Sequence, residues 1–147
     1  MLHQTPAITS GRETPPNPRN AGMIAAAIYE HAFLAAFTAA SDILEIGPLP
    51  FGARMIEAEL ITGDLGAGVT ATLVTLSGNE GEANNARVEA LSIQSGIAAH
   101  NASIRLATAN LLAVTPGKVH RGLGLKFSAN IAAGGTKTVK LLLKYTF

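Results

Sequence analysis

Residues 120–147 read HRGLGLKFSANIAAGGTKTVKLLLKYTF, and this stretch decides the fold class. Apolar side chains occupy every second position twice, first over residues 123–131 and then over residues 139–147. A period of two is typical of β-strands with one buried and one exposed face. Gly134 and Gly135, between the two runs, indicate a turn. We therefore predict a two-stranded hairpin whose apolar face the rest of the chain must cover.

Upstream of this hairpin, short apolar segments alternate with Gly, Pro and polar clusters. Residues 47–52 (GPLPFG) predict a turn, because each proline fixes φ and removes a hydrogen-bond donor. Residues 86–99 fit either a helix or a strand. A total of about eight short strands, with turn signals roughly every 8 to 12 residues, is typical of an all-β sandwich or barrel. The other segments expected to be strands are residues 23–33, 42–46, 54–62, 69–77 and 102–107.

The segment 54–62 is the clearest of these strands. Its alternation turns Ile56, Ala58 and Leu60 toward the core and leaves two glutamates on the exposed face. Opposite charges on neighbouring strands stabilise a sheet when they lie side by side. The charge-pairing residues that we predict are Glu57, Glu59, Lys140 and Lys144.

Charge is unevenly distributed along the chain. All ten acidic residues precede position 90, whereas seven of the eleven basic residues follow it. Such a chain can pair its two halves within one fold or pair the halves of neighbouring copies. A nucleic-acid site is the least favoured interpretation, because the basic residues lack the interleaved aromatic side chains of a base-stacking surface.

The first 22 residues differ in composition from the rest. They contain four prolines among polar residues, show no periodicity and have too little apolar surface to fold alone. We predict an extended N-terminal arm over residues 1–22 and one β-sandwich domain over residues 23–147. The arm is either a terminus without a role or a segment that becomes ordered on a neighbouring molecule.

Several function classes are excluded or disfavoured by composition. The chain has no Cys, which excludes disulfides, thiolate chemistry and Cys-ligated metals. No apolar run reaches the ~18 residues of a membrane span, and the N-terminus has no signal-peptide pattern. The four histidines have no partner at a ligand-like spacing, and no nucleophile elbow is present. Asp64, Glu80 and Glu82 lack the dense spacing of a calcium loop. We expect no enzyme activity, no cofactor, no metal and no membrane partner.

Three motifs resemble those of a known protein family. The motif GPLPFGAR (residues 47–54) joins two predicted strands, and the motifs RGLGLKF (121–127) and VKLLLKY (139–145) close the chain. This pattern resembles the small head proteins of tailed bacteriophages known as capsid decoration or cement proteins, over residues 24–147.

The resemblance implies a fold, a location and partners. It implies a jelly-roll-like antiparallel β-sandwich, commonly a homotrimer, on the outer capsid surface of the virion. There it stabilises the head by bridging adjacent subunits of the major capsid protein. The family has no active site, and its contacts usually involve the N-terminal arm and sheet edges. For this chain, the capsid contacts implied are Thr5, Pro6, Arg12, Pro15, Pro16, Pro18 and Arg19.

A second function is compatible with the same fold class. A β-sandwich can serve as the carbohydrate-binding or receptor-binding module of a head fibre or tail. Sugar sites generally need exposed aromatic side chains for stacking, and this chain has no Trp and only two Tyr. The alternative is therefore the less favoured of the two.

Overall fold

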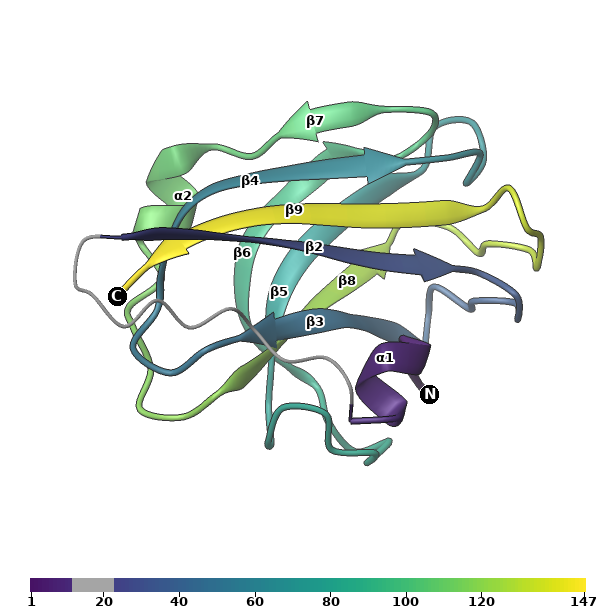
Figure 1. The fold of residues 1–147 in the computed structure, drawn as a ribbon. Helices are drawn as coiled ribbons and strands as arrows, with labels where there is room; N and C mark the ends of the chain where they lie inside the picture. Colours follow the sequence, from purple (N-terminus) through teal and green to yellow (C-terminus); the bar gives the residue numbers. More distant parts are fainter. Residues whose placement is uncertain (12–22) are drawn as a thin grey trace.

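The computed structural model describes residues 1–11 and 23–147, which form a two-layer β-sandwich (Figure 1). One sheet has the strand order β1-β3-β8-β5-β6 and the other β2-β9-β4-β7. Strands β2 to β9 follow the jelly-roll order, and only the β1–β3 pair among the described strands is parallel. The predicted all-β sandwich is confirmed. In chain order the elements are β1 (Leu2–Gln4), α1 (Pro6–Thr9), β2 (Ile24–Ala32), β3 (Ile43–Leu49), β4 (Arg54–Thr62), β5 (Thr70–Leu76), β6 (Glu89–Ala98), β7 (Ser103–Arg105), α2 (Thr108–Leu112), β8 (Arg121–Phe127) and β9 (Thr138–Thr146).

The two C-terminal strands form no hairpin. Strands β8 and β9 exist near the predicted positions but belong to different sheets, so the hairpin prediction is wrong (Figure 1). Their apolar faces meet across the core instead of lying side by side. The residues that they bury there are Leu123, Leu125, Phe127, Val139, Leu141, Leu143 and Tyr145.

Strand β4 has the predicted bounds but a different set of buried residues. Its pairing with β9 shifts between Met55 and Glu57, which leaves Ile56 as the extra residue of a β-bulge. Because of the bulge, Met55 is buried and Ile56 is only partly buried. Ala58 and Leu60 face the core as predicted.

Strand β3 runs further than predicted, through the first proline of the expected turn. Pro48 pairs with Gly122 of β8, and its carbonyl accepts a 2.8 Å hydrogen bond from the buried Tyr29 hydroxyl. The Tyr29 ring packs directly on Gly47, where any Cβ would lie 2.4 Å from two ring carbons. This contact joins the end of β3 to β2 at one corner of the sandwich.

The segment left open between helix and strand is strand β6, at the edge of its sheet. Its pairing with β5 shifts register in three places, and Gly96 has a positive φ of 68°. The short helix α2 contacts β4 and β6, burying Leu111 on that side of the sandwich.

Residues 1–11, which were expected to belong to an extended arm, are folded onto the sandwich. Strand β1 pairs with β3 over the register Leu2↔Ile43 to Gln4↔Glu45. Thr5 is the N-cap of α1 and accepts a hydrogen bond from the Ile8 N–H, and Ile8 is buried. The sandwich thus gains a fifth strand in one sheet.

A buried ion pair fixes the loop after β5 and the N-terminal strand to the same sheet. Glu45 on β3 is 0% exposed and Arg87 is 4% exposed; their two hydrogen bonds measure 2.8 and 3.0 Å. The Glu45 carboxylate also accepts hydrogen bonds from the Gln4 side chain and the Gly81 N–H. Arg87 donates further to the carbonyls of Ser77 and Glu82. The donors that surround the carboxylate therefore come from two segments, β1 and the loop between β5 and β6.

We predict that Gly47→Ala lowers the free energy of unfolding by about 1–3 kcal/mol, because the new methyl group would overlap the Tyr29 ring. Urea denaturation monitored by circular dichroism measures the change. Gly135→Ala is the matched control, since a Cβ at Gly135 meets nothing within 4 Å. A loss in Gly135→Ala as large as in Gly47→Ala would contradict the steric explanation.

We also predict that Arg87→Ala destabilises the fold by about 3–5 kcal/mol, because Glu45 is then left charged and buried without its cation. The same denaturation experiment applies. Lys126→Ala breaks the partly exposed ion pair with Glu89 and should cost less than about 1 kcal/mol. Equal losses in the two variants would show that burial of the Glu45–Arg87 pair does not matter.

Candidate interaction site

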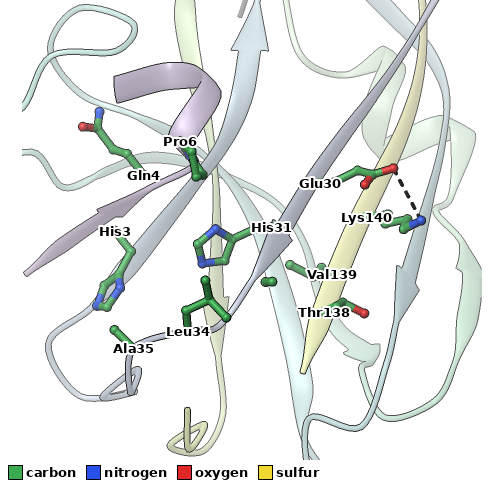
Figure 2. A pocket seen from close by; sticks show the side chains of 11 residues that line it. His3, Gln4, Pro6, Glu30, His31, Leu34, Ala35, Thr138, Val139 and Lys140 are labelled. Carbon is green, nitrogen blue, oxygen red and sulfur yellow. Dashed lines mark ion pairs between the residues drawn. The ribbon is translucent and has the colours of Figure 1, made fainter. Parts of the chain in front are cut away.

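The candidate site is an open corner of the sandwich, where the N-terminal segment approaches the end of β2. A cavity of about 470 Å³ lies there between β1 and α1 on one side and β2 and β9 on the other (Figure 2). Its lining is mainly apolar, and the ion pair between Glu30 and Lys140 lies on the β2–β9 side. The lining residues are His3, Gln4, Pro6, Glu30, His31, Ala32, Leu34, Ala35, Thr138, Val139 and Lys140.

His31 is the most unusual side chain of this cavity. Figure 2 shows its ring pointing from β2 into the space between Pro6 and Leu34. Its Nδ1 atom is buried and has no hydrogen-bond partner, and the ring packs edge-on against Phe33 with centroids 4.9 Å apart. Burial, with a smaller contribution from the nearby His3, lowers the pKa of His31 from 6.5 to about 4. The ring is therefore neutral at pH 7.

His3, on the facing wall, is held by an acidic residue at the start of β3. Its Nε2 lies 2.9 Å from Asp42, which also accepts hydrogen bonds from the Thr38 N–H and the Ser41 hydroxyl. Burial alone would raise the pKa of Asp42. The hydrogen bonds, including one from the Met1 amino group, outweigh burial and bring this pKa well below its usual range. Asp42 is thus ionised and anchors β1 beside the cavity.

The exposed face of the second sheet carries one ion pair among the four residues predicted to pair, and Lys140 and Glu59 have other partners. Lys144 lies 3.2 Å from Glu57, as predicted. Lys140 pairs with Glu30 of β2 at 3.4 Å, and the Glu59 carboxylate accepts a hydrogen bond from the Ser103 hydroxyl. Two further ion pairs, Arg105–Glu57 and Lys126–Glu89, also join a basic residue after position 90 to an acid before it. The two charge-segregated halves of the chain therefore pair within one fold.

Two of the predicted contact residues lie at or near the cavity. Pro6 lines it, and Thr5 is buried as the N-cap of α1. The remaining residues predicted as contacts, Arg12, Pro15, Pro16, Pro18 and Arg19, lie outside the described residues.

Sequence reasoning missed the residues that shape this corner. The sequence assigned no binding role to His31 or His3, because neither has a partner at a ligand-like spacing. The alternating pattern that identified β2 contained the available signal, because it places His31 on the same face as the buried Tyr29. No spacing rule connects His3 to Asp42, which come together only through the parallel β1–β3 pairing.

Over residues 1–11 and 23–147, no group of three or more His, Asp or Glu side chains could hold a metal ion. None of the helices in these ranges is long and apolar enough to cross a membrane. The corner therefore offers a mainly apolar surface, with one ion pair between Glu30 and Lys140 on its β2–β9 side.

We predict that the stability of the fold decreases as the pH falls from 6.5 to about 4, partly because of His31. In that range the unfolded chain binds a proton at His31 and the folded chain does not, so protonation favours unfolding. Urea midpoints measured across this range for the natural chain and for His31→Gln give the contribution as a difference. Asp42 acts in the same direction only at lower pH, below its ordinary value near 4. Parallel curves for the two proteins between pH 6.5 and 4 would contradict the assignment.

Comparison with known proteins gives similarity at the level of three-dimensional structure. No protein-family model matches the chain, and no curated protein matches its sequence. A chain from the capsid of Ralstonia phage GP4 superposes with a TM-score of 0.85 and 25% identity, covering 99% of this chain and 97% of that one. A chain from the capsid asymmetric unit of cyanophage Pam1 superposes with a TM-score of 0.54 and 23% identity, with 91% of each chain covered. The second match shows the shared fold alone, and the first supports a phage capsid-related structural protein.

Proposed function

We propose that this chain is a structural component of a phage virion that binds the outer capsid surface and stabilises it by bridging subunits of the major capsid protein. It acts as a homotrimer in this proposal. The proposal is that of a decoration or cement protein, with no catalytic role.

The match to the GP4 capsid chain is the observation that supports the proposal most. The match extends over nearly the whole length of both chains. It therefore includes the N-terminal elements β1 and α1 and is not limited to the eight strands of the sandwich core. The motifs of the closing strands and of residues 47–54 point to the same family by sequence pattern.

The surface is consistent with binding to a protein wall. The exposed face of the second sheet is close to neutral, since its lysines are paired with glutamates of neighbouring strands. Two large apolar side chains, Ile24 and Ile28, remain exposed on β2. Exposed apolar side chains that gather on one element are typical of protein contact surfaces. The seven residues from Thr5 to Arg19 named above remain proposed capsid contacts, with Pro6 beside the cavity.

The alternative, a carbohydrate-binding or receptor-binding module, has less support. Of the seven aromatic residues, five are buried in the core, which leaves only Phe51 and Phe147 with exposed rings. Phe51 packs against His120 beside a shallow second cavity. Phe51 is the only one of the seven aromatic residues that lines this second cavity, and one ring provides little stacking surface for a sugar.

The test uses empty capsid shells of the parent virus, prepared without this chain. Purified chain should co-sediment with the shells and raise the temperature at which they come apart, because a ligand that bridges subunits stabilises the assembled state. Light scattering on the free chain should give three times the mass of one chain. Shells already saturated with the chain serve as the control and should take up no more.

One result would contradict the proposal directly. If the chain stays in the supernatant in the presence of shells, it does not decorate them. Binding to a glycan array by the same preparation would then favour the receptor-binding alternative.

A further inference from the structure

The strand edges of the sandwich are not equally protected. Strands β1 and β7 are three residues long, and β6 is interrupted by three register shifts. Strand β2 (Ile24–Ala32) differs from these, because it is nine residues long and pairs with β9 without a single shift. Short or bulged edges resist the addition of another strand, whereas a long regular edge invites it. Within residues 1–11 and 23–147, no strand pairs with the outer side of β2.

The pairing with β9 shows which backbone groups of β2 face outward. The Phe33 N–H donates to the Lys137 carbonyl at 2.8 Å, just beyond the last pair of the β2–β9 ladder, Ala32↔Thr138. In an antiparallel ladder, hydrogen-bonded and non-hydrogen-bonded pairs alternate, so the odd-numbered residues of β2 bond to β9. The backbone N–H and C=O groups of Ala26, Ile28 and Glu30 therefore point to the open side.

The side chains along this edge restrict the chemistry of a partner. Ile24 and Ile28 are each 62% exposed on the outer face of the sheet. Glu30, the only charged residue of β2 on that face, is already paired with Lys140. The open cavity with its neutral His31 lies at the end of the same edge. An occupant therefore needs an extended backbone that can form hydrogen bonds with the outward N–H and C=O groups of β2. It also needs apolar side chains on one face, and it needs no charged side chain, because β2 has no unpaired charge on that face.

We propose that an extended, predominantly apolar segment of the major capsid protein adds to the free edge of β2 as a further strand, with its end at the cavity lined by His31 and Leu34. This inference rests on the proposed function and names the surface through which it would operate. The backbone hydrogen bonds provide affinity, and the cavity selects the side chain that ends the strand.

Symmetry disfavours a second copy of the chain as the occupant. Among the described strands, β2 is the only long regular edge, so a second copy could pair with it only through its own β2. Such self-pairing is two-fold and closes as a dimer, whereas the ring of a trimer needs two different complementary surfaces. In the proposed trimer, the β2 edge of each copy is therefore left for the capsid protein.

The first experiment measures amide hydrogen exchange in the natural chain, free and bound to shells of the major capsid protein. In the free chain, the amides of Ala26, Ile28 and Glu30 should exchange rapidly, and those of Ala27 and Tyr29 slowly. Binding to shells should slow exchange at the even-numbered positions by about tenfold or more. Bound chain with unprotected amides at these three positions would overturn the inference, and the proposed function would still stand.

The second experiment blocks the edge by substitution. Ala26→Pro removes an outward N–H and places a ring on the free side, while the bonds to β9 are kept. Ala26→Val is the matched control, since it keeps the N–H and adds comparable apolar bulk. Shell binding should weaken about tenfold or more in Ala26→Pro and change little in Ala26→Val, with similar melting temperatures for both variants.

Three other outcomes would overturn the inference. Shell binding by Ala26→Pro that is as tight as that of Ala26→Val would show that the edge is not used. A lower mass of Ala26→Pro in solution without shells would assign the edge to a second copy. Failure of the natural chain itself to bind shells would remove the proposed function and this inference together.

Discussion

The apolar faces of β8 and β9 must be covered by one another, and the architecture follows from this constraint. Each strand presents an alternating row of large side chains that is stable only when removed from water. Because the two strands lie in different sheets, their rows meet across the core. Each strand then has neighbours on both sides, β3 and β5 for β8 and β2 and β4 for β9. The last 27 residues thereby form the centre of both layers, and the earlier strands complete them.

The ends of the sandwich are closed by different physical means. Phe33, Phe37 and Phe127 form a mutual edge-to-face cluster with centroids 5.4 to 5.7 Å apart, which joins the two sheets near the ends of β2 and β8. The loop after β5 is fixed by an ionic contact, the buried pair of Glu45 and Arg87. Apolar rings tolerate small displacements, whereas a buried ion pair tolerates almost none without a large penalty. The loop and β1 are consequently the parts of the fold most sensitive to single substitutions of charge.

The sequence predicts what depends on local alternation and fails where distant segments meet. The bounds of β4 were predicted residue by residue, because Arg54–Thr62 has clear alternation and flanking turn signals. The hairpin was wrong because the Gly-Gly turn gives no information on whether the next strand returns to the same sheet or crosses to the other. The burial of Glu45 was not predicted, because it depends on Arg87, 42 positions away. Ile56 was expected in the core, and a bulge that no local pattern indicates moved Met55 there instead.

The candidate site combines features that would be liabilities in a free monomer. An unbulged edge with exposed isoleucines promotes association, and natural sheets usually protect such edges with bulges, prolines or lysines. This chain applies that protection at β6 and keeps β1 and β7 short, so its absence at β2 is selective. The neutral His31 and the paired Glu30 also leave no charge there that would repel an apolar strand. A protein whose working state is an assembly can keep such an edge, because the edge is covered once assembly is complete.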